Sequence, residues 1–446
     1  MDAPQRVSLI VGIDERLKWW QNIVYGLQQL TVDTTILIIP VLLARSLKLP
    51  PESSAFVVRA ALTGAGLVTI AQALWVLRLP VLQGPAIVFV SVVPAVVATS
   101  GLAAAWTAMI IASLIAAALS LFGFWGRVRL IFGAAPVYGV VILMAALTIA
   151  GVIIGQVVGF PNTPSFGKPF NFVMAFIPYV VALLIVLFMP RSFLRFVALL
   201  LGAVIAVAVA LLSGKMNFAA AAQAPWIGFL MFFPFGFQFD LGATLVMLLA
   251  YIADLGQVVG SYVLVGEDIG KQTVTNKRID CGILTESLGS AISAVFGGLP
   301  TVTYNQNIGA LAVTRIGSRF VFATAGVILL ILGQSPKIGA VVAAIPGPIV
   351  GGLLLVTIAA LCMQAIRVLG SMPQTDANLF IAGTSIVIGI GVTALPHDFI
   401  AMLPSLVRPF VSAGIVVAFV IAGVLHILLN VIPRKNEVQE DTAAKQ

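Results

Sequence analysis

The sequence predicts an all-α polytopic membrane protein, with fourteen membrane-spanning segments arranged as two inverted halves of seven. The composition, the spacing of apolar stretches and the placement of basic residues lead to this prediction. Of the 446 residues, 60% are hydrophobic and only 9% are charged, and the mean hydropathy is +1.12. A water-soluble domain carries about a quarter charged residues and needs polar residues to cover its surface. The chain is therefore expected to be surrounded by lipid.

Apolar stretches of helical length occur along the whole chain, separated by Gly, Pro and charged residues. A spanning helix needs roughly 20 residues. We expect the first seven spans at residues 22–44, 56–77, 84–99, 102–124, 135–158, 172–189 and 194–213. The second seven are expected at residues 243–265, 281–297, 304–315, 318–334, 338–365, 376–394 and 410–432. Three of these stretches, 84–99, 281–297 and 304–315, are too short to cross as regular helices.

The basic residues support this count when the N-terminus is placed inside. Of the 24 Lys and Arg, 17 then lie on the cytoplasmic side, and the seven outside are Arg45, Lys48, Arg59, Lys168, Lys215, Lys337 and Arg408. This bias is what the positive-inside rule requires. We expect a cytoplasmic N-terminus over residues 1–19, one membrane unit over 20–432 with repeats at about 20–213 and 240–432, and a cytoplasmic tail over 433–446.

The sequence lacks features of several other classes of protein. The net charge of +8 is explained by the cytoplasmic loops, and no basic run with interleaved aromatic residues predicts nucleic-acid binding. The start of the chain lacks the apolar core of a cleavable signal peptide, and a bacterial inner (plasma) membrane is the simplest location. Cys281 and Cys362 have no metal-ligand or redox spacing and are expected to be unpaired. With only two histidines, His397 and His426, and no nucleophile beside a base, we expect no enzyme activity, metal or cofactor.

The third segment of each half is interrupted in the same way. LPVLQGPAIVFV (residues 79–90) opens the third span and LPTVTYNQNIG (residues 299–309) opens the tenth. Seven spans per half give the second half the opposite orientation, and interrupted segments at matching positions of inverted halves indicate a transporter's binding site. Pro and Gly free backbone amides that can face a ligand near the membrane midplane. The alternative is that these residues only kink the spans for packing.

Polar side chains gather at the start of the tenth span. They are Thr301, Thr303, Tyr304, Asn305, Gln306 and Asn307. Because a side-chain amide both donates and accepts hydrogen bonds, this cluster favours a planar heterocycle with alternating N–H and C=O edges. Helix capping by Asn305 or Thr303 is an alternative explanation for one residue of the cluster, but not for all of them.

QNIGALAVTR, from Gln306 to Arg315, resembles the signature of the nucleobase–ascorbate transporter family, which includes the uracil and xanthine permeases. The stretches GLPTVTY, QGPAIVF and IPGPIVGG (residues 298–304, 83–89 and 345–352) resemble other parts of the same family, and the resemblance covers about residues 20–430. It implies short strands in segments 3 and 10 that meet at the substrate. It also implies a core domain (segments 1–4 and 8–11) that moves like an elevator against a gate domain (segments 5–7 and 12–14), and a homodimer.

The resemblance also implies the site residues. Gln306 would hydrogen-bond the base, Asn307 would support the site, and the backbone at Ala86 and Ile87 would complete it. The other residues that stand at positions of the family's site or signature are Gln29, Ala253, Gln257, Tyr304, Thr314 and Arg315. Arg315 would lie at the cytoplasmic end of the tenth segment. Uracil-type members usually carry Glu at the position of Gln306, so the glutamine favours a purine such as xanthine, urate or guanine over uracil.

The carboxyl groups depart from the family pattern. In YIADLGQVVGSY (residues 251–262), Ala253 stands where the family usually has Glu, and Gln257 stands where it has Asp or His. Gln28-Gln29 replaces the family's Gln-His. Asp254 lies one residue from the Glu position, about 100° around a helix. Ionisable groups within a membrane are costly and are therefore functional candidates.

Three carboxyl groups remain within the predicted spans. Asp33 and Asp254 are candidate proton carriers, whereas Glu286 stands where the family has Asp and is expected to make a structural contact. The alternatives for Asp33 are a neutral acid with a local hydrogen bond to Thr34 or Thr35, or a residue in a water-filled cavity.

Two functions remain open. The first is a secondary active transporter, a proton symporter of a nucleobase. The second is an anion transporter or exchanger for sulfate, bicarbonate or a carboxylate, because two half-helix N-termini at one site suit an anion. The expected partners are the small-molecule substrate, the lipid bilayer and a second copy of the chain.

Overall fold

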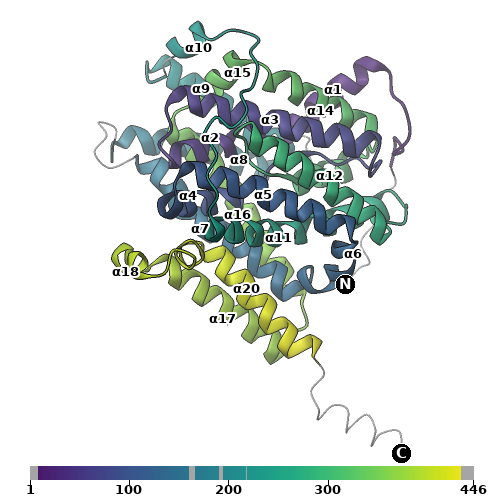
Figure 1. The fold of residues 1–446 in the computed structure, drawn as a ribbon. Coiled ribbons are helices and arrows are strands. Elements are labelled where there is room, and N and C mark those ends of the chain that lie inside the picture. The colour runs from purple at the N-terminus through teal and green to yellow at the C-terminus, as the bar shows by residue number, and fades with distance from the viewer. Residues whose placement is uncertain (1–8, 160–165, 190–193, 217, 433–446) are drawn as a thin grey trace, which may run out of the picture.

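The computed structural model describes residues 9–159, 166–189, 194–216 and 218–432. The predicted tail at 433–446 and residues 1–8 lie outside the described residues. The chain is mostly helical, and segments far apart in the sequence pack side by side (Figure 1). By length and composition, seven helices can cross a membrane, or nine if each of two bent pairs is one span. A membrane protein with several apolar spans is therefore confirmed.

The elements follow one another along the chain. The first half contains α1 (Trp19–Val32), α2 (Thr35–Ser46), α3 (Pro51–Leu74), β1 (Gln83–Pro85), α4 (Phe89–Ser100), α5 (Leu102–Leu121), α6 (Phe124–Phe132), α7 (Ala135–Val158), α8 (Pro169–Phe188) and α9 (Leu194–Leu212). The second half contains α10 (Ala219–Gln223), α11 (Leu241–Val263), η1 (Leu264–Ile269), α12 (Asn276–Val295), β2 (Thr301–Thr303), α13 (Asn305–Thr314), α14 (Arg319–Gly333), α15 (Pro336–Ala343), α16 (Gly347–Ser371), α17 (Asp376–Thr393), α18 (His397–Met402), α19 (Arg408–Ser412), α20 (Gly414–His426) and η2 (Ile427–Val431).

Two predicted spans are broken rather than continuous. The prediction of one helix at 22–44 is wrong, because α1 and α2 meet at an angle of 42°. At this break the Asp33 carboxylate accepts a hydrogen bond from the Thr35 hydroxyl, and such local side-chain bonds compete with helix formation. The prediction of one helix at 338–365 is also wrong, because α15 ends at Ala343 and α16 begins at Gly347. Pro346 and Pro348 prevent α15 and α16 from forming one helix, since proline has no N–H to donate.

The segment predicted to be short at 281–297 is a full helix. α12 begins five residues earlier and has 20 residues. Its first turns carry Lys277, Arg278 and Asp280, which ended the apolar stretch in the sequence. The Arg278 guanidinium is satisfied by the Leu77 carbonyl, which accepts from its Nε at 3.0 Å and also from Nη2. A charged residue can thus belong to a packed helix when a backbone carbonyl beyond the end of another helix accepts its hydrogen bonds.

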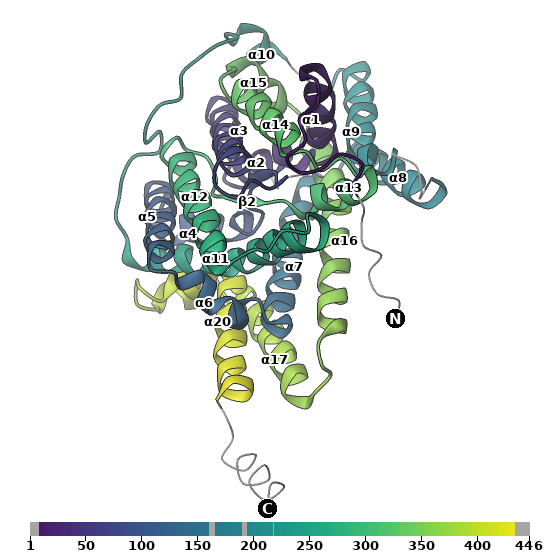
Figure 2. The same ribbon diagram turned by 90° about the vertical axis from the view of Figure 1, so that its right-hand side faces the viewer.

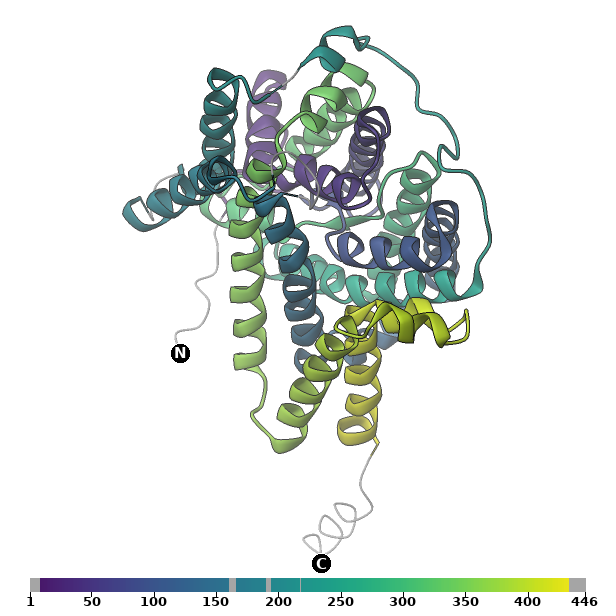
Figure 3. The same cartoon turned by 90° about the vertical axis from the view of Figure 1, so that its left-hand side faces the viewer.

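Corresponding helices of the two halves make corresponding contacts. α3 of the first half packs against α14 of the second, and α5 of the first half packs against α12 of the second. In the predicted order of seven plus seven spans, α3 corresponds to α12 and α5 corresponds to α14, so the two contacts are equivalent. α7 and α16 lie side by side (Figures 2 and 3). The α3–α14 contact depends on two glycines, because a Cβ on Gly66 would lie 2.6 Å from the Gly326 carbonyl oxygen. Small residues at such a crossing let two membrane helices approach closely.

A two-stranded sheet lies among the helices (Figure 2). β1 pairs antiparallel with β2, with Gln83 opposite Thr303 and Pro85 opposite Thr301. All six strand residues are buried. α4 starts shortly after β1 and α13 starts two residues after β2, so two helix N-termini meet at this pair. The broken segments therefore bring helix ends, strand ends and the polar cluster together.

Candidate functional site

A cavity of about 40 Å³ lies beside the strand pair, and eight of its lining side chains are polar. The polar residues are Thr35, Gln257, Thr303, Tyr304, Asn305, Gln306, Thr357 and Gln364, and the apolar ones are Ile39, Ile87, Val302 and Leu361. No lining residue is charged. The lining residues come from α2, from the connection between β1 and α4, and from α11, β2, α13 and α16. The lining therefore offers amide and hydroxyl groups to a neutral or weakly charged polar ligand.

Four side-chain amides line this cavity, and three have hydrogen-bond partners. Gln257 Nε2 donates to Asp254 Oδ1 at 2.6 Å, and Gln364 Nε2 donates to the Tyr138 hydroxyl at 3.0 Å. Asn305 Oδ1 accepts a hydrogen bond from the Ser261 hydroxyl. The exposed amide of Gln306 has no hydrogen-bond partner among the described residues. Gln306 is thus the lining amide with both its donors and its acceptor available to a ligand.

Asn307, the next residue, has a different role. Its side chain is buried, and its Nδ2 donates to the Gln29 carbonyl at 2.8 Å and to Gln29 Oε1 at 3.0 Å. These bonds hold α13 against α1. Asn307 and Gln29 therefore lie behind the cavity and position the helix that carries Gln306.

A buried polar network supports the strand pair from behind. Glu286 Oε2 accepts from the Tyr262 hydroxyl at 2.7 Å, from Gln83 Nε2 at 3.1 Å and from the Thr303 hydroxyl at 3.2 Å. Gln83 Nε2 also donates to Gln72 Oε1 at 2.7 Å. Buried polar groups are costly unless they are bonded, so this network stabilises α3, β1, α11, α12 and β2 as one unit.

Asp33 and Asp254 each lie one hydrogen bond behind the cavity. Asp33 accepts from Thr35 and Asp254 accepts from Gln257, and both of these donors line the cavity. Each carboxyl group is almost fully buried, and its Oδ2 atom has no hydrogen-bond partner among the described residues. Two under-satisfied carboxyl groups thus lie close to the cavity but outside its lining.

The remaining predicted residues divide between the cavity and its surroundings. Ile87, Gln257, Tyr304 and Gln306 line it, whereas Ala253 is buried outside it. The Ala86 N–H donates to the Pro300 carbonyl at 2.8 Å, so the protein already uses the donor expected to face a ligand. Thr314 and Arg315 lie at the far end of α13, where the Arg315 carbonyl accepts from the Ile10 N–H at 2.8 Å. In the described part of the chain, no group of three His, Cys, Asp or Glu could hold a metal ion.

Comparison with known proteins identifies the family. Residues 20–398 match the xanthine/uracil permease model, which is described as "Permease family". The chain belongs to this family. It is 30% identical over 442 residues to the putative purine permease CPE0397 of Clostridium perfringens (97% of this chain, 96% of that one). It is 29% identical over 432 residues to the uric acid transporter UacT of Escherichia coli (94% and 88%).

The solved structures include a similar fold. The murine Slc26a9 anion transporter in the inward-facing state superposes with a TM-score of 0.62 at 11% identity, covering 93% of this chain and 69% of that one. At this identity the likeness shows the fold alone. The predicted membership of the nucleobase–ascorbate transporter family is confirmed, and the chain is an integral, multi-pass membrane protein of a permease family.

One wall of the site in this permease was not expected from the sequence. Thr357, Leu361 and Gln364 of α16 all line the cavity. Their spacing of four and three residues places them on one face of a helix. Thr357 and Gln364 interrupt an apolar segment, and this signal could have identified them. They were missed because nothing in the sequence shows that this face meets the signature segment.

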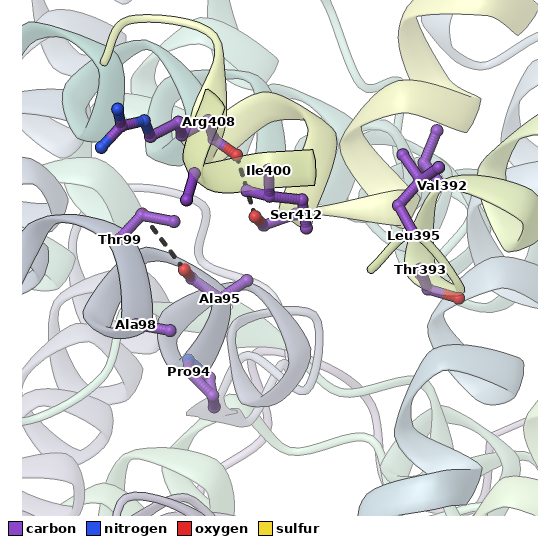
Figure 4. Close-up of a pocket in the computed structure, with 11 residues that line it drawn as sticks. Pro94, Ala95, Ala98, Thr99, Val392, Thr393, Leu395, Ile400, Arg408 and Ser412 are labelled. Carbon is purple, nitrogen blue, oxygen red and sulfur yellow. Dashed lines mark hydrogen bonds between the residues drawn. The ribbon is translucent and has the colours of Figure 1, made fainter. Parts of the chain in front are cut away.

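A second, larger cavity of this permease lies at the far end of α4 (Figure 4). It has a volume of about 470 Å³ and lies between Pro94–Thr99 and residues of α17, α18 and α19. Its hydroxyl groups are bonded within their own helices, as for Thr99 to the Ala95 carbonyl and Ser412 to the Arg408 carbonyl (Figure 4). The Nε of Arg408 donates to the Leu403 carbonyl at 2.7 Å. This cavity has volume but few free groups with which to recognise a base.

Proposed function

We propose that this protein is a secondary active transporter of a nucleobase. The observation that carries the proposal is the free amide of Gln306 in an uncharged, amide-lined cavity where two helix N-termini meet. An amide can pair with an N–H and an adjacent C=O of a heterocyclic ring, and Gln306 has no protein partner among the described residues to displace. The substrate would leave the site chemically unchanged, because the lining residues offer no nucleophile beside a base.

A purine is the favoured substrate, such as xanthine, urate or guanine. The names of the purine permease CPE0397 and the uric acid transporter UacT support this choice. Gln306 supports it as well, because a neutral amide accepts from and donates to a purine edge without placing a negative charge next to the base. The positive ends of α4 and α13 would stabilise a base that carries partial or full negative charge.

The proposed mechanism is an elevator movement of a core against a gate. In this proposal the chain forms fourteen segments in two inverted repeats, with both termini in the cytoplasm of a bacterial cell. The gate domains of two copies hold a homodimer together. A cavity of about 40 Å³ is far smaller than the roughly 300–1,000 Å³ of common ligand pockets. Because its walls come from the proposed core and from α16 of the proposed gate, a base would enter when these two parts separate.

The test of the substrate class is ligand-induced thermal stabilisation of the purified protein. A ligand that binds only the folded state stabilises it by about 2.7 kcal/mol at one hundred times its Kd. We expect one purine to raise the melting temperature of the wild type and of Gln374→Ala, whose side chain lies in a distant loop, but not of Gln306→Ala. Stabilisation by sulfate or bicarbonate alone would instead establish the anion transporter. An unchanged response of Gln306→Ala would remove Gln306 from the site.

Asp33 and Asp254 are the proposed proton carriers. Both lie one hydrogen bond from the cavity, and an amide at either position keeps the size of the side chain but cannot carry a proton. In proteoliposomes, we expect Asp33→Asn or Asp254→Asn to bind the purine yet lose the acceleration of uptake by an imposed proton gradient. Asp240→Asn is the control, since asparagine also caps a helix and Asp240 caps α11. If both cavity variants respond to the gradient like the wild type, neither carboxyl group carries the proton.

A further inference from the structure

The segment between α10 and α11 is apolar and contains neither helix nor strand. Residues 225–239, PWIGFLMFFPFGFQF, include seven aromatic residues and no charged residue. We call this segment the aromatic ribbon. It runs along the outer edge of the molecule in two opposite views (Figures 2 and 3). The sequence predicts this segment only as part of the loop between the spans at 194–213 and 243–265, and it does not predict what surrounds that loop.

The aromatic ribbon turns most of its large side chains away from the protein. The exposed fractions of Trp226, Ile227, Phe229, Phe237 and Phe239 are between 60% and 93%. Phe235 is partly buried, with its ring 4.3 Å from the Trp106 ring, and the mostly exposed Phe232 ring lies 4.9 Å from the Phe296 ring, both measured between centroids. The segment is thus attached to the protein along one side and apolar on the other.

Its attachment points lie at the ends of spanning helices. The Phe233 N–H donates to the carbonyl of Val295, the last residue of α12, at 2.8 Å. The Gly228 N–H donates at 3.0 Å to the carbonyl of Gln334, which follows α14. Arg59, the ninth residue of α3, donates from its side chain to the Gly228 carbonyl. These helix ends all lie on one side of the membrane in the predicted topology, so the aromatic ribbon follows the membrane surface rather than crossing it.

The backbone of this segment limits how deeply it can lie. Irregular backbone exposed to lipid does not occur in the hydrocarbon interior, because no water is present to bond its N–H and C=O groups. Tryptophan concentrates where apolar chains meet headgroups, and phenylalanine occurs with it on the apolar face of interfacial segments. Lys337 lies 4.9 Å from the Trp226 ring centroid, which places a cation at the same level. Both constraints are met at the boundary between headgroups and acyl chains.

We infer that the aromatic ribbon is a phospholipid-binding anchor that inserts Trp226, Phe229 and Phe237 into the outer headgroup boundary of the bilayer. This inference does not depend on the identity of the transported substrate. The proposal is that the aromatic ribbon contacts the lipid interface, rather than water or a second copy of the chain.

The test measures the surroundings of one residue of the aromatic ribbon. Cys281 and Cys362 are replaced by alanine, and Phe229→Cys is labelled with an environment-sensitive fluorophore in nanodiscs. Glu52→Cys, which is exposed at the start of α3 on the same predicted side, is the matched control. We expect spin-labelled lipids with a nitroxide near the headgroup to quench the label at position 229 severalfold more than at position 52. Aqueous iodide should show the opposite order.

Two results would overturn the inference. Equal iodide quenching at both positions, without quenching by lipid, would make the aromatic ribbon a loop in water. Efficient cross-linking between two Phe229→Cys copies, again without quenching by lipid, would make it a contact between subunits. If Phe229→Cys does not yield folded protein, the same measurement is made at Phe239→Cys, which is also mostly exposed.

Discussion

Gly84 faces the ring of Tyr304 across the strand pair. A Cβ at this position would lie 2.3 Å from Tyr304 Cζ, closer than real atoms approach. The same ring lines the cavity, and its hydroxyl donates to the Pro85 carbonyl at 2.8 Å. The missing side chain of Gly84 thus allows Tyr304 to reach both the strand and the site.

We therefore expect Gly84→Ala to lower the free energy of unfolding by about 1–3 kcal/mol, the usual cost of overpacking. It should also weaken purine-induced stabilisation, because the ring must move. Gly309→Ala is the control, since nothing lies within 4 Å of a Cβ there and alanine favours a helix over glycine. Thermal unfolding with and without purine measures both effects. Equal melting temperatures for the two variants would show that the Tyr304 ring relaxes freely.

α3 and α14 approach each other closely at two glycines. Gly66 and Gly326 each lie so close to the other's carbonyl oxygen that a Cβ would be within 2.6–2.9 Å of it. Because α3 belongs to the first half and α14 to the second, this contact joins the two halves of the chain. The strand pair depends on it, since β1 follows α3 and β2 precedes α14.

Gly66→Leu should therefore separate the two helices and prevent the strand pair from forming. We expect a large loss of monodisperse protein on size-exclusion chromatography and a melting temperature well below that of the wild type. Gly260→Leu on α11 is the matched control, because Gly260 is exposed and has open space around it. A Gly66→Leu protein as stable as the control would show that the helices can repack around a large side chain.

Thr35 of α2 and Leu361 of α16 both line the cavity. In the proposed mechanism α2 belongs to the core and α16 to the gate. If the two parts must separate to admit a base, a covalent link between them stops transport. The small volume of the cavity makes these side chains suitable for such a link.

In a Cys281→Ala, Cys362→Ala background, we expect Thr35→Cys combined with Leu361→Cys to lose uptake after treatment with a short bifunctional thiol reagent. A reductant that cleaves the link should restore uptake. Each single variant, treated identically, separates tethering from simple blockage of the cavity. Uptake by the tethered protein at the untreated rate would contradict a moving wall.

Local sequence patterns carried much of the fold and part of the site. Hydropathy indicated the helices, and Pro and Gly indicated both interrupted segments. The signature predicted Gln306, which lines the cavity. These features depend on neighbours in the chain, such as a missing N–H at a proline or an apolar run of helical length. The break at Asp33 and the true start of α12 at Asn276 were missed, because a hydrogen bond to Thr35 and the distant Leu77 carbonyl decide them.

By itself, the sequence determined that the chain lies in a membrane, which family it belongs to, and where its two broken segments occur. Only the tertiary structure decided that three of the cavity's amides are bonded while Gln306 has no partner among the described residues. It also decided that α16 contributes three residues to the lining and that residues 225–239 follow the helix ends. The physical reason is the range of the interactions. Hydropathy and backbone breaks act between neighbours in the chain, whereas hydrogen-bond partners and exposure depend on residues that only folding brings together.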